Sequence, residues 1–89
     1  MIRQQVEIIN KLGLHARAAA KFVTLASSFQ SDIHLVNDTT RVNGKSIMGV
    51  MMLAASQGTL LELEVDGPDQ ADAATQLCNL IKNRFDEEN

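Results

Sequence analysis

Apolar and polar positions alternate in several short stretches of this chain and recur every three to four positions in others. Alternation is typical of a half-buried strand, and the longer spacing is typical of an amphipathic helix. The alternating stretches predict strands over residues 2–9, 32–37, 40–43 and 60–65. The helical spacing predicts helices over about 16–28, 47–53 and 70–84. The expected element order is therefore β-α-β-β-α-β-α.

The same pattern predicts which side chains are buried. In the last strand Leu61, Leu63 and Val65 point inward, while Glu62 and Glu64 point into water. The inward positions of the other long strands are Ile2, Val6, Ile8, Ile33 and Leu35. The buried helix stripes are Ala19, Phe22, Val23, Ala26 and Phe29, then Ala71, Ala74, Leu77, Cys78, Ile81 and Phe85. Strands with one apolar face predict an α+β fold, an antiparallel sheet covered by helices on one side. Residues 86–89 are expected to fray.

Size and composition narrow the class of protein. Eighty-nine residues, 45% of them hydrophobic, support a single domain over 1–89. The net charge of −3 argues against a nucleic-acid binder, because no basic stripe is present to release counterions. The lone Cys78 excludes an internal disulfide, and no apolar run approaches the ~20 residues that span a bilayer. We therefore expect a cytoplasmic protein without a signal peptide or membrane insertion.

The run Gly13-Leu14-His15-Ala16-Arg17 places an imidazole and a guanidinium where a loop turns into a helix. A helix start offers unpaired backbone N–H groups and the positive end of the helix dipole. An anion carried on His15 would meet both, and Arg17 would add charge-assisted hydrogen bonds. Taken alone, His15 is only an exposed histidine at a helix start. In this setting, the run predicts a site for phosphate.

This run, followed by Ala-Ala-Lys-Phe-Val at 19–23, closely resembles the active-site segment of HPr, the histidine phosphocarrier family of the bacterial phosphotransferase system. A second segment, Gly-Lys-Ser-Ile-Met-Gly-Val-Met at 44–51, is similar to the regulatory-serine helix of that family. Length and element order agree as well, so the resemblance covers nearly the whole chain. It implies the HPr-like open-faced β-sandwich, a four-stranded antiparallel sheet with three helices on one face. The sugar branch and its nitrogen-branch paralogue both remain open.

The resemblance also implies roles for particular residues. His15 would accept a phosphoryl group from enzyme I at Nδ1 and pass it to enzyme IIA domains. Arg17, with the backbone N–H groups of Ala16 and Arg17, would stabilise the phosphate. Ser46 would be phosphorylated by HPr kinase/phosphorylase, and a transcriptional regulator is a further candidate partner. The implied protein is a monomeric carrier and not a stand-alone enzyme, and it needs no cofactor and no metal.

Two departures from the family pattern stand out. HPr proteins usually carry proline directly after the active-site arginine, whereas this chain has Ala18. Alanine is an excellent helix former, so we expect the helix to survive while the His15–Arg17 geometry becomes less rigid. The exposed side of the first helix carries Thr24 and Ser27, where sugar-branch members often carry basic residues. Steering toward acidic partners should be weaker, which mildly favours a regulatory or nitrogen-related branch.

The segment that begins at Ser46 has two interpretations. Ser46 is sufficient as a plain helix N-cap, and its family context adds regulation by phosphorylation. A short helix cannot bury all the apolar residues that follow, so Ile47, Met48 and Met51 are expected to form an exposed patch for partners near His15. Lys21 and Lys45 are expected to be the basic residues of the same surface.

Two rival functions compete with the phosphocarrier. The first is a regulatory binding module that docks residues 47–51, with or without phosphorylated Ser46, onto a transcription factor or enzyme and transfers nothing. The second is a generic ligand-binding α+β domain, which requires an apolar pocket in the sheet. A metal site is not expected, because His34 lies at an outward strand position and Cys78 on a buried helix face.

Overall fold

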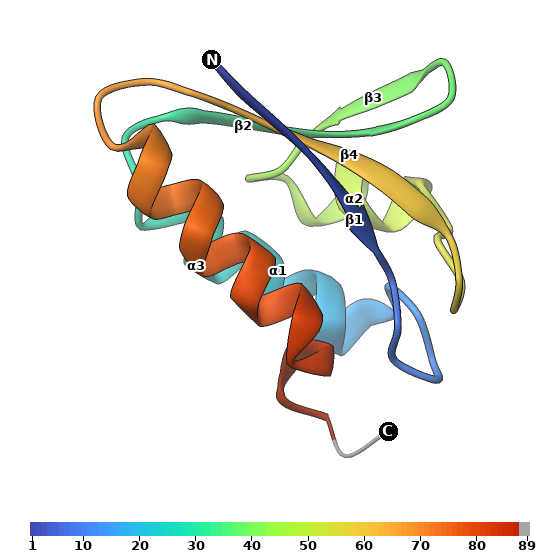
Figure 1. The fold of residues 1–89 in the computed structure, drawn as a ribbon. Coiled ribbons are helices and arrows are strands. Elements are labelled where there is room, and N and C mark those ends of the chain that lie inside the picture. The colour runs from blue at the N-terminus through green and yellow to red at the C-terminus, as the bar shows by residue number, and fades with distance from the viewer. Residues whose placement is uncertain (88–89) are drawn as a thin grey trace.

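The predicted strands form one antiparallel sheet in the computed structural model, which describes residues 1–87 (Figure 1). The strands are β1 (Ile2–Glu7), β2 (Asp32–Asn37), β3 (Thr40–Asn43) and β4 (Leu60–Asp66). Their order across the sheet is β1-β4-β2-β3. The first strand of the chain, β1, is therefore an edge strand and pairs with the last strand, β4, inside the sheet. Ile2 pairs with Val65 and Ile33 pairs with the same residue from the other side. This register places the alternating apolar side chains on one face.

The helices pack on that face. They are α1 (Ala16–Ser27), α2 (Ile47–Met52) and α3 (Gln70–Lys82), followed by a short turn, η1 (Arg84–Asp86). The element order is as predicted, and α1 runs unbroken through Ala18. Two boundaries differ from the prediction by more than one residue. Strand β1 ends at Glu7 and not at residue 9, and α3 ends at Lys82 because the backbone turns left-handed from Arg84 onward.

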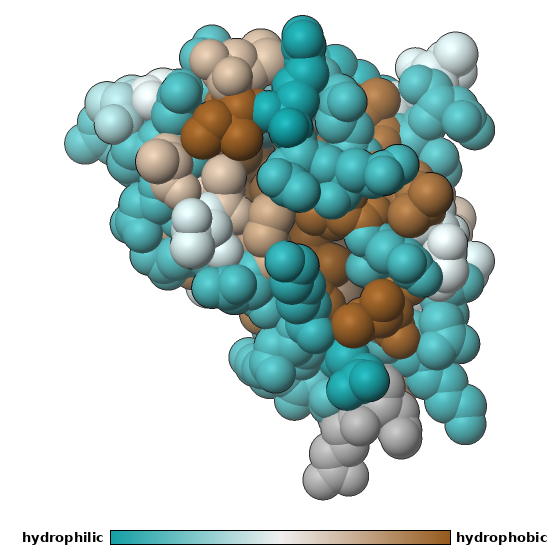
Figure 2. Space-filling view, in the orientation of Figure 1, coloured by the Kyte–Doolittle hydropathy of each residue, from teal (hydrophilic) through white to brown (hydrophobic). Residues whose placement is uncertain are grey.

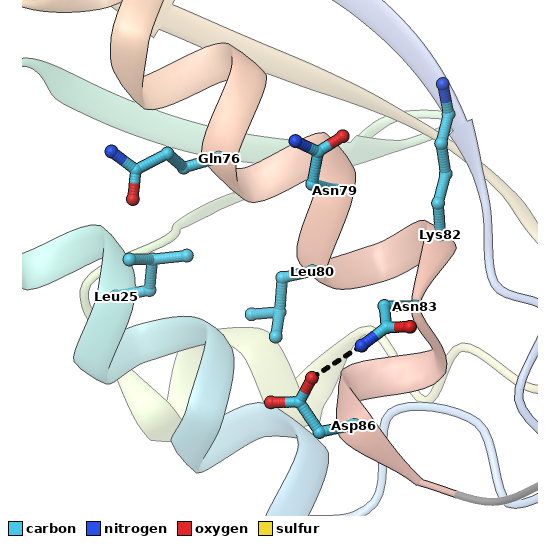
Figure 3. A pocket seen from close by; sticks show the side chains of 7 residues that line it. All are labelled: Leu25, Gln76, Asn79, Leu80, Lys82, Asn83 and Asp86. Carbon is cyan, nitrogen blue, oxygen red and sulfur yellow. Dashed lines mark hydrogen bonds between the residues drawn. The ribbon is translucent and has the colours of Figure 1, made fainter.

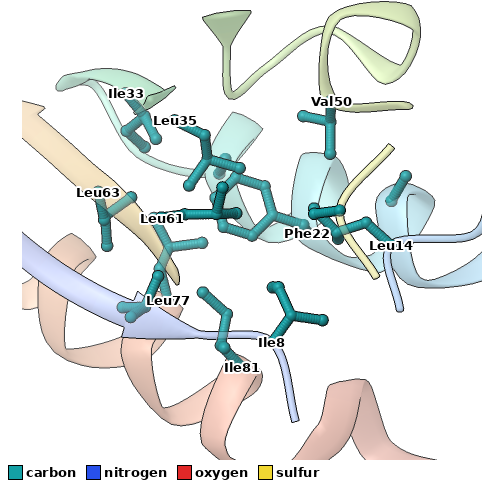
Figure 4. Packing of buried hydrophobic residues seen from close by; sticks show 14 of the residues in the cluster. Ile8, Leu14, Phe22, Ile33, Leu35, Val50, Leu61, Leu63, Leu77 and Ile81 are labelled. Atoms are coloured by element: carbon teal, nitrogen blue, oxygen red, sulfur yellow. The ribbon is translucent and has the colours of Figure 1, made fainter. Parts of the chain in front are cut away.

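One aliphatic core lies between the sheet and the helices. Phe22 of α1 occupies its middle, with strand residues on one side and Leu77 and Ile81 of α3 on another (Figure 4). Val50 of α2 and Leu14, which precedes His15, belong to the same cluster. The loop before α1 is therefore fixed to the core directly, and so is the helix that begins after Ser46.

The burial pattern corrects several sequence-based expectations. Ala18 and Ala73 are fully buried, whereas Val23 and Cys78 are half-buried and Ala71 is exposed. Helices α1 and α3 therefore turn a slightly different face to the sheet than predicted. Each buries an additional alanine, whose small side chain allows close approach to the sheet. Phe85 is buried as predicted, but it reaches the core from η1 and not from a continued helix.

The expectation that the Glu64 side chain points into water is also wrong. Glu64 lies on the outer face of β4 as the alternation requires, but it is only 9% exposed and is not a solvated carboxylate. The Nε atoms of Arg41 and Arg3 lie 3.0 and 3.5 Å from its oxygens. The hydrogen bond from Arg41, the largest influence, outweighs desolvation and lowers the pKa of Glu64 below its usual value. Glu64 is covered because Arg3 of the adjacent β1 and Arg41 of β3, two strands away, extend their long cationic side chains over it.

Figure 2 shows apolar side chains gathered in the middle of one face of the molecule, between polar borders. A groove between β1 and α3 is lined there by Ile2, Val6, Ala74, Cys78 and neighbouring residues. None of the predicted site residues lines this groove. Within residues 1–87, no helix has the length and apolar character that a membrane crossing requires.

Candidate functional site

A tightly held loop positions His15 at the start of α1. Gly13 has φ +69°, and a Cβ at this position would lie 2.5 Å from the carbonyl oxygen of Ala55. Only glycine fits this close approach without strain. The next residue, Leu14, is buried and donates its N–H to the same carbonyl over 2.8 Å. The loop therefore has one position relative to the core when the chain enters the helix.

His15 is the N-cap residue of α1, with extended backbone and a carbonyl that accepts from the N–H of Ala19. Its imidazole makes no capping bond to the helix. The side chain is 28% exposed, so a donor protein can reach it. The first N–H groups of α1 have no partners within the helix, which leaves them available to an anion beside the ring.

Glu87 contacts His15, a contact that the sequence reasoning missed. Its Oε2 lies 2.5 Å from Nε2 of His15, and its Oε1 accepts a hydrogen bond of 2.7 Å from the side-chain amide of Asn10. The same amide donates to the carbonyl of Gly13 over 2.8 Å. Glu87 was expected to fray, and Asp86 with it, so that expectation is wrong for both. The other two residues of that expectation, 88 and 89, lie outside the described part of the chain.

The pKa of Glu87 is lowered despite partial burial. Desolvation, the largest single influence, raises it. The hydrogen bonds from Asn10 and His15, together with attraction to the charges of His15 and Lys21, outweigh that effect. Glu87 is consequently an ionised carboxylate at neutral pH, placed against one nitrogen of the imidazole.

The turn η1 holds Glu87 in place. Arg84, Phe85 and Asp86 all have positive φ, of 56°, 54° and 63°. The Phe85 ring is fully buried, and its carbonyl accepts a hydrogen bond of 2.8 Å from Nζ of Lys21. Asp86 points back toward Asn83 and accepts a 2.7 Å hydrogen bond from its side-chain amide (Figure 3). The cleft drawn there lies between α1 and α3, lined by Leu25, by residues of α3 and by Asn83 and Asp86 beyond its end.

The other predicted phosphate ligands, Ala16 and Arg17, directly follow His15 in the chain but make no side-chain bond to it in the described structure. Ala16 and Arg17 are exposed in the first turn of α1. Within residues 1–87, His15 has no hydrogen bond or ion pair to Arg17. A cation in the first helical turn is disfavoured by the helix dipole, and a bound anion would remove that disadvantage.

The predicted partner surface is centred on α2. Ser46 is its N-cap, and its Oγ accepts a 3.1 Å hydrogen bond from the N–H of Gly49. Ile47, Met48 and Met51 are exposed, at 45%, 76% and 42%. Met52, which the prediction left out, is 74% exposed.

The two lysines predicted for that surface are partly engaged elsewhere. Nζ of Lys45 donates to the carbonyl of Phe29 over 2.8 Å, and Nζ of Lys21 binds the turn η1. Among residues 1–87 no three His, Cys, Asp or Glu side chains gather in a way that could hold a metal ion.

Comparison with known proteins places this chain in a family. The family model for the PTS HPr component phosphorylation site matches residues 2–83. The phosphocarrier protein HPr of Neisseria meningitidis serogroup A is 56% identical over 87 residues, 98% of each chain. That of Cupriavidus necator is 52% identical over the same share. A crystal structure of HPr from Thermoanaerobacter tengcongensis matches with a TM-score of 0.96, 47% identity and full coverage of both chains. The family-model match over residues 2–83 and the identity to these relatives over nearly the whole chain show that the chain belongs to the HPr family of phosphocarrier proteins.

Proposed function

We propose that this protein is a phosphoryl carrier of the phosphoenolpyruvate-dependent phosphotransferase system. His15 accepts the phosphoryl group from enzyme I and passes it to enzyme IIA domains in the cytoplasm. The protein is a relay and not a stand-alone enzyme, since the phosphohistidine is the product that it hands on. It needs no cofactor, because the donor protein supplies the phosphoryl group.

The observation that carries the proposal is the state of the His15 ring. One nitrogen, Nε2, faces Glu87, and the other, Nδ1, has no hydrogen-bond partner among residues 1–87. An unprotonated imidazole nitrogen is a nucleophile at neutral pH, and its phosphoramidate remains able to transfer the group. The partly exposed ring at the start of α1 supports Nδ1 as the acceptor.

Groups at the start of α1 neutralise the negative charge of the phosphate on His15. The backbone N–H groups of Ala16 and Arg17 lie at the positive end of the helix dipole. The Arg17 guanidinium, exposed in the same turn, is long enough to reach a phosphate on the neighbouring ring and to donate two hydrogen bonds to it. These donors hold the phosphoryl oxygens without a metal ion.

The proposed partner surface is the apolar patch Ile47, Met48 and Met51, and Lys21 and Lys45 are proposed as its basic residues. Three apolar side chains exposed together on one short helix are typical of a surface that other proteins cover. Methionine side chains adapt to different partners, which suits a carrier that must dock on a donor and on acceptors in turn. Enzyme I and enzyme IIA domains are the proposed partners of this patch, and the carrier meets each as a monomer.

Regulation at Ser46 is a separate proposal. The Ser46 hydroxyl begins a helix and already accepts a backbone N–H, so a phosphate on it would stay close to that donor. It would also place two negative charges beside the partner patch and repel acidic surfaces. HPr kinase/phosphorylase is the proposed modifying enzyme.

The test is phosphorylation with enzyme I and phosphoenolpyruvate carrying labelled phosphorus. The wild-type chain should acquire acid-labile label, and His15→Ala should acquire none. The matched control is His34→Ala, which removes the chain's other histidine from the outer side of β2 and should label fully. Labelling of His15→Ala, or failure of the wild-type chain to label with enzyme I of either branch, would contradict the proposal.

The exposed patch also favours a second candidate, a regulatory module that docks on a transcriptional regulator without transferring phosphate. The two functions differ in what phosphorylation of His15 does. A carrier loses its phosphate to an enzyme IIA domain within the assay. A docking module keeps its phosphate and changes only its affinity for the regulator, measurable by titration calorimetry with phosphorylated and unphosphorylated protein.

A further inference from the structure

We propose that Glu87 is a positioning residue for His15: it accepts a hydrogen bond from Nε2–H, fixes the tautomer of the ring and leaves the Nδ1 lone pair to attack phosphorus. The inference rests on the proposed function, because it assigns Glu87 a part in that same phosphoryl transfer. It concerns a residue in the last turn of the described chain, 72 positions from the histidine in sequence.

The contact itself limits the tautomer. An ionised carboxylate only accepts hydrogen bonds, and a neutral imidazole carries its proton on one nitrogen or the other. With Oε2 of Glu87 2.5 Å from Nε2, the proton belongs on Nε2. The other nitrogen is then unprotonated, which is the state that a nucleophile requires.

Asn10 prevents the carboxylate from turning away. Its side-chain amide uses one hydrogen on the carbonyl of Gly13 and the other on Oε1 of Glu87. Asn10 is completely buried, so its amide has a fixed direction. Each oxygen of Glu87 therefore has one assigned donor, Asn10 for Oε1 and His15 for Oε2. The Glu87 side chain is only 15% exposed, which keeps competing water away from most of it.

The backbone accepts strain to deliver Glu87 to this place. Left-handed conformation costs about 1–2 kcal/mol for each non-glycine residue, and three consecutive residues of η1 adopt it. Strain of this kind persists only where surrounding contacts over-determine it. The buried ring of Phe85, the Lys21 hydrogen bond to its carbonyl and the Asn83–Asp86 bond do so here.

The Nε2 proton stays on the ring throughout the transfer step. The Nδ1 lone pair forms the N–P bond, and the bond between phosphorus and the donor group breaks, its electron pair leaving with the donor. No proton is lost from His15, so the ring becomes an imidazolium that carries the phosphoryl group. Glu87 faces the developing positive charge and stabilises it, as a buried carboxylate does for the histidine of a hydrolase triad. Return of the phosphoryl group to an acceptor reverses each change.

Glu87→Gln separates this role from simple packing, because the amide has the same shape and one acceptor. The Asn10 amide must still donate to residue 87, so the glutamine oxygen turns toward Asn10 and its NH₂ toward His15. An NH₂ group donates to Nε2, which then must be unprotonated. The variant should therefore place the imidazole proton on Nδ1, the nitrogen that the reaction needs free.

The experiment combines ¹⁵N NMR of the His15 ring with transfer rates. At a pH where the ring is neutral, the unphosphorylated wild-type protein should show protonated Nε2, and Glu87→Gln should show protonated Nδ1. The first-order rate of phosphorylation by enzyme I should fall on the order of tenfold or more in Glu87→Gln, because the reactive nitrogen then carries the proton. The matched control is Asp86→Asn, which removes an equal charge one residue away and keeps the bond to Asn83. It should retain the wild-type tautomer and rate.

An unchanged tautomer in Glu87→Gln would overturn the proposal, whatever happens to the rate. A changed tautomer with a rate within twofold of wild type would overturn it too, since the proton position would then be irrelevant to transfer. Failure of the proposed function has a different signature. The wild-type chain would then receive no phosphoryl group, while the NMR measurement, which needs no donor, would still report the contact.

Discussion

A carboxylate fastens each end of α3 to a distant part of the chain. At its start, Asp69 accepts hydrogen bonds from the backbone N–H groups of Gln30 and Ser31 and from the Ser31 hydroxyl. Beyond its end, Glu87 accepts from Asn10 and His15. Both carboxylates have lowered pKa values. Single charged residues thus connect the last helix to the loop before β2 and to the loop before α1.

Asp69 gives a pH-dependent prediction. The Ser31 hydroxyl, followed by the Gln30 N–H, lowers the pKa of Asp69 below its ordinary value of 3.8. A folded-state pKa below the unfolded one contributes stability above the unfolded pKa, and that stability is lost as the pH falls through the folded value. Asp69→Asn should therefore lower the urea midpoint at neutral pH, and its difference from wild type should shrink below about pH 4.

The control for this prediction is Asp72→Asn, which removes an exposed carboxylate from the same helix. Asp72 contributes only a favourable first-turn charge and one exposed hydrogen bond from Gln76, so its removal should lower the urea midpoint less than Asp69→Asn does. A constant difference between Asp69→Asn and wild type from pH 7 down to pH 2.5 would show that the Asp69 charge adds no stability.

At the scale of elements, glycine geometry decides where His15 sits. Gly13 and Gly58 both have positive φ, of 69° and 90°. A Cβ on Gly13 would collide with the backbone of Ala55, whereas one on Gly58 meets nothing within 4 Å. The two positions therefore separate backbone strain from steric overlap.

Gly58→Ala should cost about 1–2 kcal/mol of unfolding free energy, from the left-handed backbone alone. Gly13→Ala should cost more, because the loop must also move away from Ala55. The displaced loop shifts His15, so phosphorylation by enzyme I should slow in Gly13→Ala and stay near wild type in Gly58→Ala. Urea titrations and labelling time courses measure both. Equal losses of stability in the two variants would mean that the contact with Ala55 imposes no constraint.

The regular elements could be predicted from the sequence because their periodicity reports burial directly. Leu61, Leu63 and Val65 alternate on β4 as expected, and Phe22 and Ala26 lie on the buried side of α1. The family resemblance, carried by the residues around His15 and Ser46, added the fold and the class of function. It did so because both runs lie at helix starts, where sequence and geometry are closely linked.

The end of the chain could not be predicted in the same way. Arg84, Phe85 and Asp86 include no glycine or asparagine to signal a left-handed turn, and the apolar spacing of α3 continues through Phe85. The pattern therefore extended the helix past Lys82. The contact of Glu87 with His15 depends on that turn, so it could not be found without the fold. The burial of Asn10 could not be predicted either, because a loop residue belongs to no periodic pattern of apolar positions.

The whole molecule presents two different faces to a partner. The outer side of the sheet is polar, with Glu64 covered by arginines, and α2 exposes apolar side chains. With a net charge of −3, long-range attraction toward acidic partners is weak. Docking should therefore depend more on apolar contact at α2 than on electrostatic steering.

Met48→Gln tests this balance, since it keeps the length of a side chain that is 76% exposed while making it polar. Stability should stay within about 0.5 kcal/mol of wild type, as is usual for a surface substitution. The KM for the carrier in the enzyme I reaction should rise several-fold, while kcat changes little. The control is Leu60→Gln, at an exposed apolar position on β4. An unchanged KM in Met48→Gln would exclude the patch from docking.

His15 is expected to carry the phosphoryl group on Nδ1 while Nε2 stays bound to Glu87. The most direct measurement is a phosphorus–nitrogen NMR correlation on ¹⁵N-labelled protein after incubation with enzyme I and phosphoenolpyruvate. We expect one phosphorus signal coupled to Nδ1 of His15, with Nε2 protonated. Coupling to Nε2, or phosphorus on any residue other than His15, would contradict it.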